Sequence, residues 1–393
     1  MIVISYYHPI EMLPPAISLI RLLKFRSKDV VYIGVTYTEQ TIAVLEELGV
    51  KYHLYQRWPV VRFIEHPFLR IWFKCVAWYR HTSFCRSCQR RFLWRSLMKH
   101  SSLEKDDLFL WTVNTWVSAL WGDGLLPLKR RHIQWLTEYG EEVGRGWAGF
   151  SIEKMFETAT LIESEINRAM LLQREKKLNI RPFVLPNKPY AHPRTRNIPV
   201  SSIGIANIIE GWKGKQVFLY QGSLGADRQG ILSIISWLCE AFPSSIVAVM
   251  SKWQPIVDEF TKKFRNFSFV PFISAPHHLE VTSYATIGIA IYTANQVAGI
   301  SPLNGLFCAP NKTFEYAGFG IPLLCNNPPG LRDSVGAANA AVCLDVLTKD
   351  SVVSGVERIM DNYESYSINA NRYFDSVDVE KIVDSILEFA ERK

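Results

Sequence analysis

The chain has 393 residues, which is too long for one ordinary hydrophobic core and fits two domains. Its hydrophobic fraction of 48% excludes a disordered protein, and no run approaches the ~18 apolar residues of a membrane-spanning helix. The net charge of +7, from 44 basic and 37 acidic residues, is modest and unevenly spread.

The N-terminal residues predict the start of an α/β domain. The opening MIVISYYHPIEM has no basic start and no long apolar run, so we expect a first strand and no signal peptide. The helical pattern AISLIRLLKF, the strand DVVYIGVTY and the helix TEQTIAVLEELG follow. Strands that alternate with helices predict a parallel sheet with crossover connections.

Residues 51–100, the basic aromatic segment, interrupt this alternation. They hold eleven Lys and Arg against one acid, Glu65, together with many aromatic residues. We expect a helical insert over about 57–100. Two interpretations stay open. The segment suits an anionic membrane surface, or it is a helical face whose basic stems cover its own aromatics.

The seven cysteines are odd in number, which indicates reduced thiols and a cytoplasmic protein. Cys85 and Cys88 form one CxxC pair. Since a closed zinc site needs four ligands and no second pair or His set accompanies them, we predict no metal site.

The alternation resumes with DLFLWTVN, RHIQWLTEY and ATLIESE, followed by the helix INRAMLLQREKKL. The 22 residues NIRPFVLPNKPYAHPRTRNIPV hold five prolines and indicate a linker. A second alternating series begins at QVFLYQG. We therefore predict an N-terminal domain over 1–190, a C-terminal domain over 191–375, and an amphipathic helix over 376–393 whose return to the first domain is left open. Two such sheets would face a cleft at their carboxyl edges, where α/β proteins bind ligands.

The segment CAPNKTFEYAGFGIPLLC, residues 308–325, carries the strongest chemical signal. Pro310 favours a helix start, and a helix N-terminus attracts phosphate. Lys312 adds a full charge there, and Glu315 shares its face. A carboxylate near a phosphate is unfavourable unless it binds something else, such as the two hydroxyls of a ribose. The alternative is an exposed Lys–Glu pair that contributes only ~0.3 kcal/mol.

A second loop, in VFLYQGSLGADRQGILSIISWL, is strand, turn and helix. Gly222 and Gly225 let the backbone approach a ligand, and Arg228 near the helix start can contact phosphate. The pattern matches neither the GxGxxG fingerprint nor the P-loop. Glycine is also common in the first turn of any α/β domain.

Together, YQGSLGADRQG (220–230) and APNKTFEYAGFGIPLL (309–324) resemble the GT-B glycosyltransferases, of the retaining family-4 kind that builds bacterial surface glycans. The resemblance covers about 205–345 and is weak before it. It implies two Rossmann-like domains and transfer from a nucleotide-diphosphate sugar.

The resemblance also implies roles for residues. Arg228 and Lys312 would hold the donor diphosphate and Glu315 the ribose, as the catalytic set. The turn around Phe269–Phe272 would hold the base, and His277 and His278 would be surface residues after it. The remaining predicted donor-binding residues are Gly222, Gly225, Phe272, Asn304, Asn311 and Thr313.

Three departures from the family pattern limit this comparison. Phe307 stands where many relatives have a further Glu, Ser223 replaces a basic residue, and YYHPIEMLPP replaces the Gly-rich acceptor loop. Asn304 can supply the missing contact to the sugar. His8 and Glu138 follow first-domain strands and are candidate acceptor residues, although a structural role for each is the simpler interpretation.

No Asp-x-Asp sequence occurs, so we expect no metal and no cofactor beyond the donor substrate; cationic side chains would stabilise the leaving diphosphate. The expected acceptor is a glycan or a lipid-linked molecule, with an anionic membrane surface as a further partner and no nucleic acid. The expected location is the cytoplasm, with peripheral attachment to the inner membrane face left open. The alternatives are another GT-B enzyme, such as a sugar-nucleotide epimerase, and a non-catalytic nucleotide-binding subunit.

Overall fold

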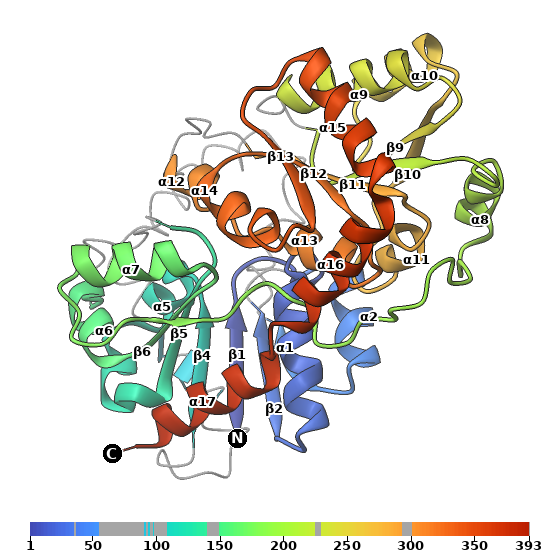
Figure 1. Ribbon diagram of the computed structural model, residues 1–393. Helices are drawn as coiled ribbons and strands as arrows, with labels where there is room; N and C mark the ends of the chain where they lie inside the picture. Colours follow the sequence, from blue (N-terminus) through green and yellow to red (C-terminus); the bar gives the residue numbers. More distant parts are fainter. Residues whose placement is uncertain are drawn as a thin grey trace, which may run out of the picture. The chain divides into compact units, whose positions relative to one another are not determined.

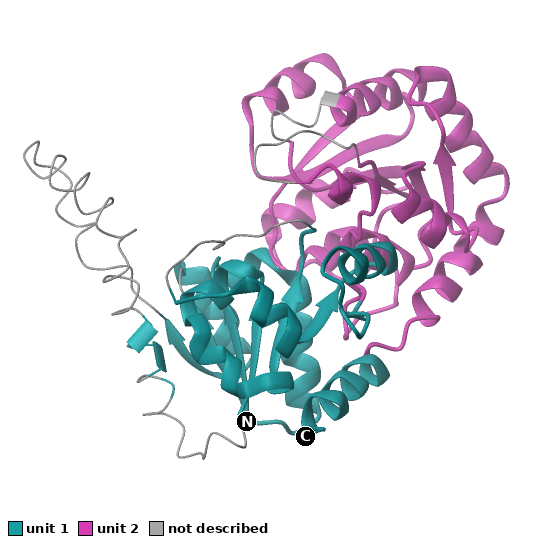
Figure 2. Ribbon diagram, turned by 90° about the vertical axis from the view of Figure 1, so that its left-hand side faces the viewer, with its two compact units in different colours: residues 1–185, 380–393 teal, residues 186–379 magenta. Residues whose placement is uncertain are grey.

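The computed structural model describes residues 1–34, 37–54, 90, 91, 93, 94, 97, 108–139, 149–224, 229–292 and 301–392. They form two compact units: unit 1 comprises Met1–Leu185 and Glu380–Lys393, and unit 2 comprises Pro186–Val379 (Figure 2). Most of the predicted insert over 57–100, with Cys85 and Cys88, lies outside the described residues.

Unit 1 contains a seven-stranded sheet in the order β3-β2-β1-β4-β5-β6-β7, and every pairing is parallel (Figure 1). The strands are β1 (Ile2–Tyr6), β2 (Val30–Gly34), β3 (Lys51–Leu54), β4 (Phe109–Val113), β5 (His132–Leu136), β6 (Thr160–Glu163) and β7 (Phe183–Val184). The helices are η1 (Ile10–Met12), α1 (Pro14–Phe25), α2 (Glu39–Glu47), α5 (Thr115–Trp121), η4 (Gly122–Arg131), α6 (Ile152–Thr158), α7 (Ile166–Glu175) and α17 (Val379–Glu391).

The C-terminal helix α17 belongs to unit 1. Arg26 after α1 lies 2.9 Å from Glu380 and 2.8 Å from Asp384. Near the other end of the helix, the ring centroids of Phe389 and Phe183 are 5.3 Å apart, and the Arg130 guanidinium lies 4.7 Å from the centroid of the Phe389 ring. Apolar and ionic contacts together hold α17 on the first unit.

Unit 2 contains a six-stranded parallel sheet in the order β10-β9-β8-β11-β12-β13. The strands are β8 (Val217–Gln221), β9 (Ile246–Ser251), β10 (Phe267–Pro271), β11 (Ile287–Ala290), β12 (Leu323–Asn326) and β13 (Ala341–Leu344). The helices are α8 (Ile203–Glu210), α9 (Gln229–Ala241), α10 (Pro255–Lys263), α11 (His278–Thr282), α12 (Leu303–Leu306), α13 (Asn311–Ala317), α14 (Pro329–Leu331), η6 (Arg332–Gly336), α15 (Lys349–Asp361) and α16 (Tyr363–Asp375).

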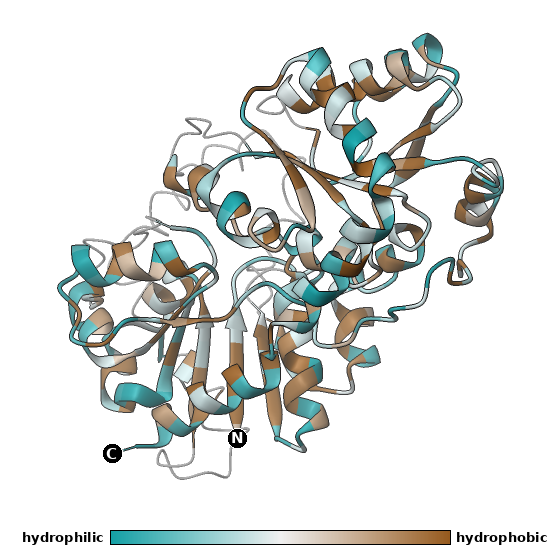
Figure 3. Ribbon diagram, viewed as in Figure 1, coloured by the Kyte–Doolittle hydropathy of each residue, from teal (hydrophilic) through white to brown (hydrophobic). Residues whose placement is uncertain are grey.

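Both faces of the unit 2 sheet are covered. Along β8, Val217 and Leu219 join one hydrophobic cluster, while Phe218 and Tyr220 join the other. Continuous apolar strands, brown in Figure 3, are what a parallel sheet with helices on both faces requires. The expected parallel α/β architecture is therefore present in both units.

Candidate functional site

Helix α13 carries the predicted site residues Lys312 and Glu315, and Tyr316 anchors it on the unit 2 sheet. The Tyr316 hydroxyl donates to the carbonyl of Leu219 in β8 at 2.7 Å, and its ring lies against Gly288 of β11. A Cβ atom at Gly288 would collide with that ring. A residue without a side chain is therefore needed there for α13 to lie this close to the strands.

Lys312 is a buried residue, which argues against the alternative of an exposed Lys–Glu pair. Only 9% of it is exposed. Its Nζ lies 4.5 Å from the ring centroid of Tyr220 and 5.3 Å from that of Tyr292. Aromatic faces attract a cation, so these two rings hold the ammonium beside the end of β8.

Gly222 is the residue after β8, and it lies next to the Lys312 ammonium. Its φ of +152° is one that side chains rarely adopt, and a Cβ atom there would lie 3.1 Å from the Nζ of Lys312. Gly222 and Lys312 are therefore neighbours, and Gly222 keeps open the space beside the cation.

Glu315 is also buried, with 5% of its surface exposed. Its Oε1 lies 3.0 Å from the Nε2 of His278, and its Oε2 accepts a hydrogen bond from the Nε2 of Gln221. Burial raises the pKa of this carboxyl, but the His278 imidazole and the Lys312 ammonium lower it more, so the pKa of Glu315 lies below its ordinary value.

His278 was expected on the surface, and this expectation is wrong. It is 9% exposed and contacts Glu315, because α11 turns it inward toward α13. His277 does lie on the surface, where its Nδ1 is 3.0 Å from Glu280. The sequence HH alone does not indicate which of two adjacent histidines faces inward.

His192, in the Pro-rich segment, was missed by the sequence analysis. Its Nε2 lies 3.0 Å from the backbone carbonyl of Glu315, and its ring packs 4.2 Å from Phe319. A Cβ atom at Gly318 would lie 2.6 Å from this ring. Burial lowers the pKa of His192 to about 4, so it supports α13 as a neutral residue near pH 7.

The other predicted donor residues have varied surroundings. The Thr313 hydroxyl donates to the Pro310 carbonyl at 2.8 Å, so it stabilises the helix start. Asn311 and Asn304 are half-buried at the starts of α13 and α12. Phe272 is 45% exposed at the end of β10, and the Nζ of Lys252 lies 5.6 Å above its ring. Gly225 and Arg228 lie outside the described residues.

The two candidate acceptor residues lie in unit 1. His8 is exposed after β1 and packs against the rings of Tyr6 and Tyr7. Glu138 is exposed after β5, and β4 lies between the two strands.

A buried ion pair near Glu138 was also missed. Glu163 at the end of β6 lies 3.0 Å from Arg168 on α7, and both side chains are almost completely buried. Burial raises the pKa of Glu163 to about 7, although Arg168 opposes this shift. No local sequence pattern indicates that these two charges are buried.

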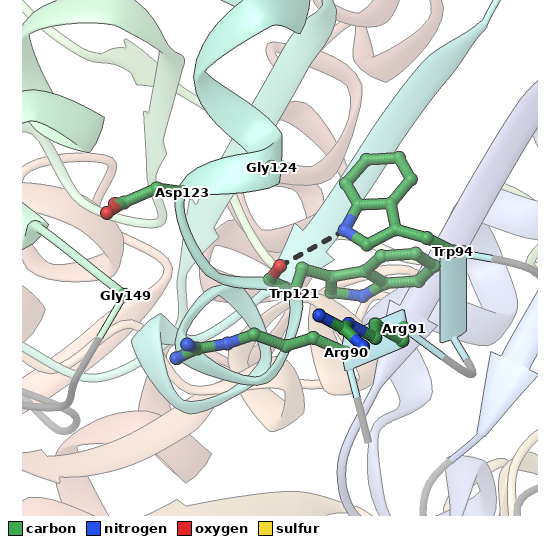
Figure 4. A pocket seen from close by; sticks show the side chains of 7 residues that line it. All are labelled: Arg90, Arg91, Trp94, Trp121, Asp123, Gly124 and Gly149. Carbon is green, nitrogen blue, oxygen red and sulfur yellow. Dashed lines mark hydrogen bonds between the residues drawn. The ribbon is translucent and has the colours of Figure 1, made fainter. Parts of the chain in front are cut away.

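A hollow of about 400 Å³ lies in unit 1 between η4 and the described part of the basic aromatic segment (Figure 4). Arg90 donates to the Ala119 carbonyl at 3.0 Å, and the indole of Trp94 donates to the Trp121 carbonyl at 3.2 Å. A Cβ atom at Gly149 would lie 2.5 Å from the Arg90 guanidinium. These two side chains pack against the domain itself, whereas Arg91 is exposed.

Among the described residues, no group of three His, Cys, Asp or Glu side chains is arranged to hold a metal ion. The described helices include none with the length and apolar character that crossing a bilayer requires.

No protein-family model matches the sequence, and no curated protein is similar to it by sequence. Solved structures are similar in fold. Anabaena Alr3699/HepE in complex with UDP and glucose matches with a TM-score of 0.64 at 10% identity, over 100% of this chain and 99% of that one. WaaG, a glycosyltransferase involved in lipopolysaccharide biosynthesis, matches at 0.56 and 14%, over 100% and 99%. A putative UDP-N-acetylglucosamine 2-epimerase from Listeria monocytogenes matches at 0.59 and 12%, over 100% and 97%.

The fold is that of the GT-B glycosyltransferases. The predicted fold class, with two Rossmann-like parallel sheets, is confirmed by these matches and by the two sheets of seven and six strands.

Proposed function

We propose that this protein is a glycosyltransferase that moves a sugar from a nucleotide-diphosphate sugar to a glycan or lipid-linked acceptor. The observation that carries the proposal is that Lys312 and Glu315 are both buried on one helix, with the cation beside Gly222. A buried cation and a buried carboxylate one turn apart match the two halves of a nucleoside diphosphate, namely its phosphates and its ribose hydroxyls.

In this proposal Lys312 stabilises the negative charge that develops on the leaving diphosphate, and Arg228 adds a second cation. Fixed charges of this kind contribute strongly to catalysis because they need no reorganisation during the reaction. Glu315 accepts hydrogen bonds from the ribose. Gly222, Gly225, Phe272, Asn304 and Asn311 complete the donor site, while His8 and Glu138 stay candidate acceptor residues.

The proposed reaction is retaining and needs no metal. The acceptor oxygen attacks the anomeric carbon on the face from which the diphosphate departs. The bond from that carbon to the diphosphate oxygen breaks, and the leaving diphosphate takes the acceptor proton. The absence of an Asp-x-Asp sequence and the motif resemblance support this scheme.

We further propose that the acceptor belongs to cell-surface polysaccharide synthesis and that the enzyme works in the cytoplasm, at the inner face of the membrane. The motif resemblance and the fold match to WaaG support this role. The basic aromatic segment supports an anionic surface as the place of action.

A second candidate is a sugar-nucleotide epimerase, which the fold match to the Listeria protein favours. The two functions are separated by one experiment. Thermal shifts with a panel of nucleotide sugars identify the donor, and the donor that stabilises the protein is then incubated with and without a glycan acceptor. A transferase releases nucleoside diphosphate and extends the acceptor, whereas an epimerase changes the sugar without an acceptor. A protein that binds no nucleotide sugar contradicts both.

A further inference from the structure

The carboxylate of Glu315 is held by one protein donor on each oxygen. His278 lies 3.0 Å from Oε1, and the amide of Gln221 donates to Oε2. All three residues are buried. Because both oxygens have a fixed neighbour, the carboxylate plane cannot rotate without losing a contact.

The Gln221 amide, which donates to Oε2 of Glu315, is itself held in one orientation. The Thr282 hydroxyl donates to the Oε1 of Gln221 at 2.9 Å, so the amide oxygen faces Thr282 and the amide nitrogen faces Glu315. Thr282 and His278 both belong to α11, and Gln221 ends β8. Thus α11 controls one oxygen of Glu315 directly and the other through Gln221.

The count of hydrogen-bond acceptors then points to a ligand. An ionised carboxylate has about four acceptor positions, two on each oxygen. His278 and Gln221 use one on each, so one acceptor per oxygen remains. A ribose with free 2′- and 3′-hydroxyls offers two donors on adjacent carbons, which matches this remainder.

We propose that His278 is a positioning residue, which together with Gln221 holds the Glu315 carboxylate so that it selects a ribonucleoside diphosphate over its 2′-deoxy form. This inference rests on the proposed function, because it concerns the ribose of the donor. His278 itself does not touch the ligand; it acts through Glu315.

The charge of Glu315 depends on its neighbours. Those that face it are His278 from α11, Lys312 from its own helix and His192 from the Pro-rich segment; Gln221 from β8 is neutral. Burial is the largest influence and raises the pKa of Glu315, while His278 and Lys312 lower it. His192 is neutral near pH 7 and contacts Glu315 at its backbone carbonyl. Without the His278 contact, less opposes the effect of burial on the pKa of Glu315. This pKa therefore rises, and the carboxyl takes up a proton at a higher pH.

Two substitutions at His278 test whether the contact with Glu315 matters or only the presence of a polar side chain. In His278→Gln the amide nitrogen can occupy the place of the imidazole Nε2 and reach Glu315. In His278→Asn the side chain is equally polar but too short to do so. His277→Asn is the matched control, because that neighbour is exposed and pairs with Glu280.

The experiment measures the affinities of UDP and 2′-deoxy-UDP by calorimetry between pH 6 and pH 8. We expect the wild type to prefer UDP by about 10-fold or more, the effect of one lost hydrogen bond of about 1.4 kcal/mol to a charged group. His278→Asn should bind UDP about 10-fold more weakly at pH 8, should lose more affinity toward pH 6, and should discriminate less. His278→Gln and His277→Asn should resemble the wild type.

The outcomes distinguish the two proposals. If the wild type binds neither UDP nor the diphosphates of adenosine, guanosine and cytidine, the proposed function is wrong and this inference is rejected with it. If the wild type binds UDP but His278→Asn matches it in affinity, pH profile and discrimination, only the role of His278 is rejected. Equal losses of UDP affinity in His278→Gln and His278→Asn likewise reject it. If His278 had only a structural role, the longer glutamine side chain, which can still contact Glu315, would not restore affinity.

Discussion

At the scale of single residues, Lys312 carries the largest predicted effect. Lys312→Met keeps the length and packing of the buried stem and removes the charge between Tyr220 and Tyr292. We expect turnover of the nucleotide sugar to fall by about 100-fold, the scale seen when a fixed charge contact to a transition state is lost. Steady-state kinetics measure this, and circular dichroism checks the fold.

The matched control for this variant is Lys213→Met, which removes an exposed lysine that pairs with the nearby Glu210. Its turnover should equal that of the wild type. If Lys312→Met turns over as fast as this control, Lys312 does not hold the diphosphate.

Glu315→Gln tests the ribose contact. The substitution keeps the shape of the side chain, removes its charge and replaces one acceptor oxygen by a donor. Hydrogen bonds to charged groups contribute about 1.5–3 kcal/mol, so UDP affinity should fall about 10-fold or more. Calorimetry measures the change, with Glu357→Gln on the exposed face of α15 as the control. Equal affinities in the two variants would mean that Glu315 contacts no ribose.

These residues also mark what the sequence could and could not predict. The association of Lys312 with Glu315 was predictable, because positions three apart share one face of a helix. Their burial was not, because it depends on the rings of Tyr220 and Tyr292 from two other strand ends. His278 and His192 come from distant parts of the chain, so only the folded structure brings them to Glu315.

At the scale of elements, the packing of α13 on β11 gives a sharp test. Gly288→Ala places a methyl group against the buried ring of Tyr316, which is fixed by its hydrogen bond to Leu219. Overpacking of a close-packed core typically costs about 1–3 kcal/mol. We expect a lower free energy of unfolding and, because α13 is displaced, weaker UDP binding. Denaturant unfolding and calorimetry measure the two effects.

Gly204→Ala is the control, because Gly204 lies in α8 with no atom within 4 Å of the added methyl group. Alanine favours a helix over glycine by about 1 kcal/mol, so this variant should be as stable as the wild type or more so. If both glycine variants behave alike, the close approach of Tyr316 to β11 is not what positions α13.

The elements themselves were largely predictable, since apolar runs such as VFLYQ and IVAVM alternate with helical patterns and become β8 and β9. Two features were not. The Pro-rich segment was expected to be a linker, yet Phe183 and Val184 add a short edge strand, β7, to the first sheet. Helix α8 was not anticipated, because eight residues with an internal glycine give a weak helical signal.

At the scale of the whole molecule, catalysis is expected to proceed without a metal ion. In the proposed mechanism, Lys312 and Arg228 stabilise the negative charge of the leaving diphosphate, and no Asp-x-Asp sequence is present to hold a cation beside it. Turnover measured in excess EDTA should therefore equal turnover in magnesium. Complete loss in EDTA that manganese or magnesium restores would contradict the metal-free mechanism.

The basic aromatic segment leads to the last prediction, which concerns the membrane. Arg90 packs against Gly149 and donates to Ala119, so its reversal to Glu would damage the domain and is left out. Arg86, Arg91 and Arg95 are reversed to Glu instead; Arg91 is exposed, and Arg86 and Arg95 lie outside the described residues. Each basic residue near an anionic surface contributes about 1 kcal/mol, and salt screens the attraction.

The wild type should therefore sediment with vesicles of phosphatidylserine and phosphatidylcholine at low salt, and less as salt rises. The triple variant should stay in solution yet bind UDP normally, because the proposed donor-binding residues lie in unit 2. Reversal of Lys262, Lys263 and Arg265, around the end of α10, makes the same charge change elsewhere and should leave vesicle binding intact. If the wild type ignores anionic vesicles at low salt, the segment instead covers its own aromatics, and the acceptor is a soluble glycan or protein.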